Sequence, residues 1–103
     1  MTIIKKVCEM IDEELEGACH YVKCALKYKE EYPGLSKTFY ELSGDEMEHV
    51  SSLHNEIVKL IEAYRRENGE PPENMLAVYD YLHERQIEKA NKVRMYQDQY
   101  KSY

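Results

Sequence analysis

The chain has 103 residues, enough for one domain with one hydrophobic core. Charged residues make up 33% of it, while glycine is 4 and proline 3, and this composition favours helices. The net charge is −6 without a block of Lys and Arg, so we expect no nucleic-acid partner. No apolar run approaches the roughly 20 residues that span a bilayer, and the N-terminal residues lack the order of a signal peptide. We therefore expect a cytoplasmic protein with no membrane partner.

The three cysteines, Cys8, Cys19 and Cys24, are odd in number and form no C-x-x-C pair. A disulfide framework is therefore not expected, which fits a reducing compartment.

The first predicted helix runs from about residue 2 to about residue 31. Its apolar residues alternate at spacings of three and four, a pattern typical of helices in bundles. Glu14 is the one acidic member of this stripe, and a buried carboxylate needs a charged partner, a proton or a metal ion. In an alternative reading the stripe steps by one residue to Leu15, and Glu14 turns toward solvent. The predicted stripe consists of Ile4, Val7, Ile11, Glu14, Ala18, Tyr21, Ala25 and Tyr28.

The second predicted helix runs from about residue 36 to about residue 68, and Gly69 is expected to cap it. Pro33 and Gly34 are expected to end the first helix, and a connection this short predicts an antiparallel hairpin. Two adjacent members of the second stripe, Glu46 and His49, are polar. His54 lies off the stripe and is expected on the surface. The predicted stripe consists of Leu35, Phe39, Leu42, Glu46, His49, Leu53, Ile57, Leu60 and Tyr64.

Glu46 and His49 form an E-x-x-H pair, which places a carboxylate and an imidazole on one side of a helix. Two-metal carboxylate proteins use this pair together with a lone Glu from a neighbouring helix, and Glu14 supplies such a residue. The alternative for His49 is a core histidine that hydrogen-bonds to a carboxylate.

The hairpin has unequal arms at these positions. Glu14 lies 19 residues before Pro33, whereas Glu46 lies 13 residues after it. In a symmetric hairpin the two would differ in height by up to about 9 Å, at 1.5 Å per residue. An asymmetric turn through residues 29–32 is expected to absorb most of this difference. Glu16 matches a symmetric loop better, but it faces away from the stripe.

The third predicted helix runs from about residue 73 to about residue 99, after the Pro71-Pro72 connector. Polar residues interrupt its apolar stripe, so it is either less buried than the other two helices or binds another subunit. Asp80 and His83 repeat the E-x-x-H spacing with a shorter carboxylate, and we do not assign them as ligands.

Counting the ligands predicts a homodimer. A two-metal site in a four-helix bundle takes about four Glu and two His, with two E-x-x-H pairs. This chain supplies half of that set, so two copies related by a twofold axis, or a larger ring of such dimers, would complete it. The expected fold is all-α: an antiparallel helical hairpin plus a third helix, in a single domain over residues 1–103.

The chain resembles the ferritin-like superfamily through residues 13–16, Tyr21 and residues 45–49. It is most similar to the encapsulated ferritins, which carry half a ferritin bundle per chain and build the ferroxidase centre between two subunits. The resemblance covers roughly residues 8–66 and implies a four-helix bundle completed by dimerisation. It implies that Glu14, Glu46 and His49 and their symmetry mates ligate the metal, with Tyr21 close to the centre but not itself a ligand. It also implies outer positions where metal ions enter, at Glu13, Glu16 and His20.

The expected function is therefore ferroxidase-type oxidation of iron by dioxygen or peroxide, with two iron ions at each dimer interface. Manganese and zinc are alternatives that the same ligand types accept. The rival interpretation is a non-catalytic helical oligomerisation or adaptor protein, in which Glu46 and His49 form a hydrogen-bonded core network that fixes helix register.

Overall fold

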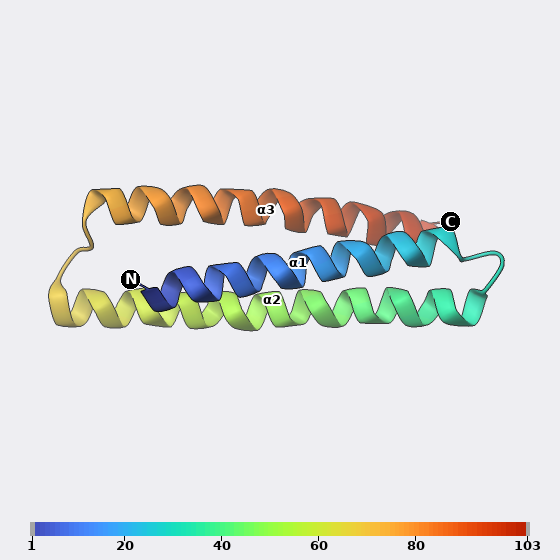
Figure 1. Cartoon of the computed structure of the whole chain (residues 1–103), viewed down its shortest axis with the longest axis horizontal. Helices are drawn as coiled ribbons and strands as arrows, with labels where there is room; N and C mark the ends of the chain where they lie inside the picture. The colour runs from blue at the N-terminus through green and yellow to red at the C-terminus, as the bar shows by residue number, and fades with distance from the viewer. Residues whose placement is uncertain (1, 103) are drawn as a thin grey trace.

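A computed structural model of the chain describes residues 2–102 and contains three helices. They are α1 (Thr2–Lys27), α2 (Pro33–Asn68) and α3 (Glu73–Ser102), and no strand occurs within the described residues. The predicted all-α class is confirmed. Figure 1 shows α2 running antiparallel to α1 and α3 returning along the hairpin, and α3 packs mainly against α1. The molecule is a rod of 56 × 19 × 18 Å. Residues 1 and 103 of the predicted domain lie outside the described residues.

The helix bounds differ from the predicted ones at the first turn. α1 ends at Lys27 rather than near residue 31, and α2 begins at Pro33 rather than near residue 36. Proline fits the first turn of a helix because its missing N–H has no intrahelical partner there. Gly34 therefore lies inside α2 and is not a cap, whereas Gly69 has a φ of 79° and ends α2 as predicted. α3 continues to Ser102, three residues beyond the prediction.

The buried stripe of α1 is the alternative one, shifted by one residue from the predicted stripe. Leu15 is buried, and Glu14 stands at the edge of the core instead of inside it. The reason is that α3 packs on the hairpin, so the core lies where all three helices meet rather than between α1 and α2 alone. The buried residues of α1 are Cys8, Ile11, Leu15, Ala18, Val22 and Ala25.

The buried residues of α2 are small, apart from one. They are Ser36, Ser43 and Ile57. Of the predicted stripe from Leu35 to Tyr64, Ile57 is buried and Leu53 packs against the core, whereas Leu35 and His49 are exposed, so the stripe is only partly the buried face. Ser36 Oγ donates to the carbonyl of Ala25, and Ser43 Oγ donates to the carbonyl of Ala18 at 2.7 Å. The two serines are seven residues apart on α2, and the two alanines are seven residues apart on α1. The two hydrogen bonds between the helices therefore fix the register of the hairpin.

α3 is attached to α2 by a few polar and aromatic contacts. The rings of His54 and His83 stack with centroids 5.0 Å apart, and Gln97 Nε2 donates to Ser43 Oγ at 3.1 Å. His54 is thus partly buried, which corrects its predicted place on the surface. α3 is less buried than α1 but not less buried than α2, so the prediction of a less buried third helix holds against α1 alone. The exposed apolar residues of α3 include Val78, Tyr81, Ile87 and Met95. Among the helices of residues 2–102, none has an apolar stretch long enough to cross a membrane.

Candidate metal centre

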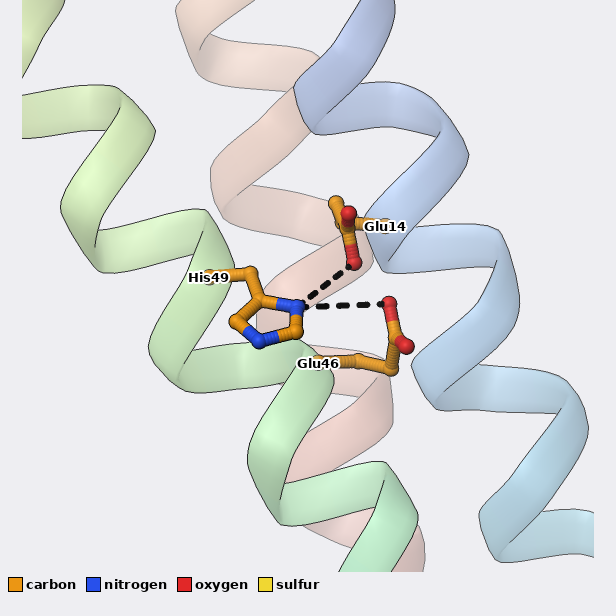
Figure 2. Close-up of side chains that lie close together, drawn as sticks. All are labelled: Glu14, Glu46 and His49. Atoms are coloured by element: carbon orange, nitrogen blue, oxygen red, sulfur yellow. Dashed lines mark hydrogen bonds and ion pairs between the residues drawn. The ribbon is translucent and has the colours of Figure 1, made fainter.

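Glu14, Glu46 and His49 come together where α1 and α2 face each other. His49 Nδ1 lies 3.2 Å from Glu14 Oε2 and 4.0 Å from Glu46 Oε2. One ligand atom from each residue lies within 4.8 Å of the other two. Figure 2 shows both carboxylates, one from each helix, pointing toward the same edge of the imidazole. Within residues 2–102, no other three His, Cys, Asp or Glu side chains bring their ligand atoms this close together.

The three side chains stand at the surface of the single chain and not in its core. The side chains of Glu14 and Glu46 are 29% and 25% exposed, and that of His49 is 58% exposed. The predicted burial of Glu46 and His49 inside the chain is therefore wrong. They project from the side of the hairpin that α3 does not cover, with the α3 ribbon behind the hairpin in Figure 2. A bound ion here would be open to solvent on one side.

The register of the hairpin brings Glu14 to this cluster. Ala18 lies opposite Ser43 and Ala25 opposite Ser36, which places Glu14 opposite Met47, between Glu46 and His49. Glu14 and Glu46 are then offset by about one residue, roughly 1.5 Å, instead of the 9 Å of a symmetric hairpin. The irregular turn between Lys27 and Pro33 absorbs most of this difference, as predicted. Glu16 is exposed and lies outside the cluster.

Gly17 is a part of the site that the sequence analysis missed. A Cβ placed on Gly17 would lie 3.6 Å from Glu46 Oε2 and 3.7 Å from its Cδ. The carboxylate of Glu46 therefore lies against bare α1 backbone. The signal in the sequence was the spacing, because Gly17 follows Glu14 by three residues and so shares its side of the helix.

The other predicted site residues lie near the cluster but do not join it. Tyr21 is half-buried and its ring stacks on Phe39, with centroids 6.2 Å apart. It follows Glu14 by two turns, about 10 Å along α1. Glu13, Glu16 and His20 are exposed on α1, and His20 Nε2 lies 4.0 Å from Cys24 Sγ.

The pair Asp80 and His83 does not form a second cluster. Asp80 is exposed, while the ring of His83 stacks between those of His54 and Tyr79. His83 Nδ1 is buried without a hydrogen-bond partner among the described residues.

Apolar side chains surround the cluster on the same side of the hairpin. By helical spacing, Ile3, Met10 and Tyr21 share the side of α1 that carries Glu14. Leu35, Phe39 and Leu42 share the side of α2 that carries Glu46. Three of them are exposed in the single chain: Ile3 by 54%, Met10 by 40% and Leu35 by 50%. We call this surface, with its six apolar residues and three ligand-type residues, the hairpin face.

The donor set of the cluster suits a first-row divalent ion. Two carboxylates and one imidazole are ligands for Fe(II), Mn(II) and Zn(II). Ligand atoms about 2.1 Å from one ion lie no more than about 4.2 Å apart, so shifts of less than about 1 Å would let all three bind it. Compared with known proteins, the chain matches no family model, no curated protein and no solved structure. The donor atoms and their positions are therefore what indicates the chemistry of this site.

Proposed function

We propose that two copies of this chain form a ferritin-like di-iron centre that oxidises Fe(II). The observation that supports this most directly is the convergence of Glu14, Glu46 and His49, with ligand atoms within 4.8 Å of one another. These residues are half of the ligand set of a two-metal carboxylate site, and they stand on a surface where a second copy can supply the other half.

The hairpin face supports a twofold arrangement. α3 covers the opposite side of the hairpin, and the exposed apolar residues around the cluster would be buried by a second hairpin. Two hairpins joined in this way make a four-helix bundle with α1 and α2 from each copy at its centre. Four carboxylates and two imidazoles then meet near the axis, and two divalent ions would neutralise the carboxylate charge.

In this proposal iron is the substrate. Two Fe(II) ions each lose one electron to become Fe(III), and dioxygen takes up both electrons and two protons to give hydrogen peroxide. In each copy Glu14, Glu46 and His49 would hold the iron, with Glu46 as the ligand shared between the two ions. Tyr21 lies about two turns away and orders the neighbouring side chains through its contact with Phe39. Exposed Glu13, Glu16 and His20 offer a path for incoming ions.

A structural role is the second candidate, and one contact favours it. The 3.2 Å contact from His49 Nδ1 to Glu14 Oε2 links α1 and α2 without any ion. On this reading, the pair fixes the hairpin of a helical adaptor protein, and α3 presents its exposed aromatic and apolar residues to a partner.

Anaerobic titration of Fe(II), followed by metal analysis, separates these candidates. We expect about two irons bound per dimer, and rapid formation of Fe(III) when dioxygen is admitted. The double variant Glu46→Ala with His49→Ala should lose both iron binding and oxidation. The matched control is Glu48→Ala, which removes an exposed carboxylate from the same helix and should change neither.

The adaptor role predicts a different pattern. The wild type would then bind no more iron than the double variant, and the double variant would lose stability because its interhelical contact is gone. Such a result would overturn the proposed iron oxidation.

A further inference from the structure

A large apolar pocket lies at the end of the rod where α1 begins. Its volume is about 600 Å³, within the range of roughly 300–1,000 Å³ that small-molecule sites occupy. Ile4 and Cys8 of α1 line it, together with Ile61 of α2 and Leu76, Tyr79 and Leu82 of α3. All three helices thus contribute to its walls. We call this cavity the end pocket.

The end pocket exists because the three helices differ in length. α1 has 26 residues, whereas α2 has 36 and α3 has 30. Figure 1 shows α2 and α3 both running past the start of α1, joined by the connector that contains Pro71. Over this stretch, two helices face each other without the third helix that fills the core elsewhere. Their apolar side chains therefore line a cavity.

Two polar groups at the wall of the end pocket are neutral at neutral pH, and burial moves their ionisation to still higher pH. Burial raises the pKa of the Cys8 thiol. The hydrogen bond to Gln86 lowers this pKa and the charge of Asp12 raises it, and the net shift is upward. Burial also raises the pKa of the Tyr79 hydroxyl, with added effects from Cys8 and Asp80. At neutral pH neither side chain carries a negative charge, so the wall does not repel an anion.

Lys5 gives the pocket its electrostatic character. Of the described residues that line it, Lys5 is the only charged one. It is exposed and stands in the first turn of α1, which has no acidic residue to neutralise the positive end of the helix. A ligand that matches these features has an aliphatic body for the apolar wall and a single negative charge at one end for Lys5.

We propose that the end pocket binds a free fatty acid, with its alkyl chain between α2 and α3 and its carboxylate at Lys5. This site is separate from the Glu14, Glu46 and His49 cluster and takes a different class of ligand. The proposal does not depend on iron oxidation, because none of the cluster residues lines the pocket.

Isothermal titration calorimetry with decanoate, below the concentration at which it forms micelles, tests the proposal. We expect one decanoate per chain and a negative heat-capacity change, the mark of apolar burial. Decanol has the same chain without the charge and should bind more weakly, and decylamine should bind most weakly of the three. The variant Glu46→Ala should bind decanoate like the wild type, which separates this site from the metal centre.

Paired substitutions at neighbouring lysines locate the carboxylate. Lys5→Glu should weaken decanoate binding by roughly threefold to tenfold and leave decanol binding unchanged, because an exposed charge contact contributes modestly. Lys6→Glu is the matched control, since Lys6 is exposed but does not line the pocket, and it should have no effect. Both lysines are exposed, so neither variant should disturb folding.

The proposal would be overturned by no saturable binding of decanoate, by equal binding of decanoate and decanol, or by equal losses in the two lysine variants. Dissociation of an oligomer by decanoate, without one-to-one binding, would also overturn it and would identify a second copy of the chain as the occupant.

Discussion

At the scale of single residues, the absence of a side chain at Gly17 leaves space for the Glu46 carboxylate to lie against α1. An added Cβ would meet the Glu46 carboxylate at 3.6 Å, which is ordinary contact, whereas a longer side chain would occupy its place. We expect Gly17→Ala to raise the free energy of unfolding by about 0.5–1 kcal/mol, because alanine favours the helix interior, without weakening iron binding. Gly17→Leu should displace Glu46 and weaken Fe(II) binding by about tenfold or more.

Gly44 provides the matched control for both substitutions at Gly17. It lies within α2, and a Cβ there would meet nothing within 4 Å. Gly44→Ala and Gly44→Leu should therefore leave iron binding unchanged. Thermal unfolding and Fe(II) titration of the four variants measure the two effects separately. Equal iron affinity in Gly17→Leu and Gly44→Leu would show that the contact between Gly17 and Glu46 has no part in metal binding.

At the scale of helices, hydrophobic spacing predicted three helices and their order but not the face that each one buries. On α1, the stripes through Glu14 and through Leu15 differ by one residue, and the choice between them depends on where α3 packs. That packing is a tertiary property which the spacing of a single helix does not contain. The spacing of apolar residues also gives no sign of Ser36 and Ser43, which are polar, yet each hydrogen-bonds to an α1 carbonyl inside the core. The convergence of Glu14, Glu46 and His49 was predictable for another reason. Residues three apart stay on the same side of a helix, so the pair Glu46 and His49 remains together when the helix turns slightly about its axis.

The stacked histidines between α2 and α3 make stability depend on pH. Burial lowers the pKa of His54, and the neighbouring His83 lowers it further. The unfolded chain therefore binds more protons than the folded one at pH values between the lowered pKa of His54 and its ordinary value of 6.5. It follows that the contribution of neutral His54 to stability is fully present above about pH 6.5 and is lost as the pH falls below it.

Urea unfolding at several pH values between 7.5 and 5.5 measures this dependence. The wild type should lose stability as the pH falls through this range, and His54→Gln should lose less because glutamine does not titrate. Carboxylates contribute little to the slope here, since their ordinary pKa values lie near 4. An equal slope in the two proteins would contradict a role for His54.

At the scale of the whole molecule, the two sides of the hairpin serve different purposes. α3 covers one side and closes the core there, with Gln86, Ala90 and Val93 buried against the hairpin. The hairpin face remains open and combines exposed apolar residues with three ligand-type residues. Apolar contact favours association of two such faces, whereas the carboxylates that would then meet oppose it. The balance between these effects depends on whether metal ions are bound.

This balance predicts that metal ions drive dimerisation. Adding Fe(II) under anaerobic conditions, or redox-inert Zn(II), should convert monomer to dimer in sedimentation velocity, and a chelator should reverse the change.

Leu35→Glu places a charge on the hairpin face and should raise the dissociation constant of the dimer by about tenfold or more. The matched control is Met95→Glu on α3, because Met95 and Leu35 are both 50% exposed and only Leu35 lies on the hairpin face. If Met95→Glu disrupted the dimer while Leu35→Glu did not, association would run through α3, and the metal ligands of two chains would not meet. Retention of a metal-dependent dimer by Met95→Glu, together with its loss in Glu46→Ala with His49→Ala, would assign the shared centre to the hairpin face.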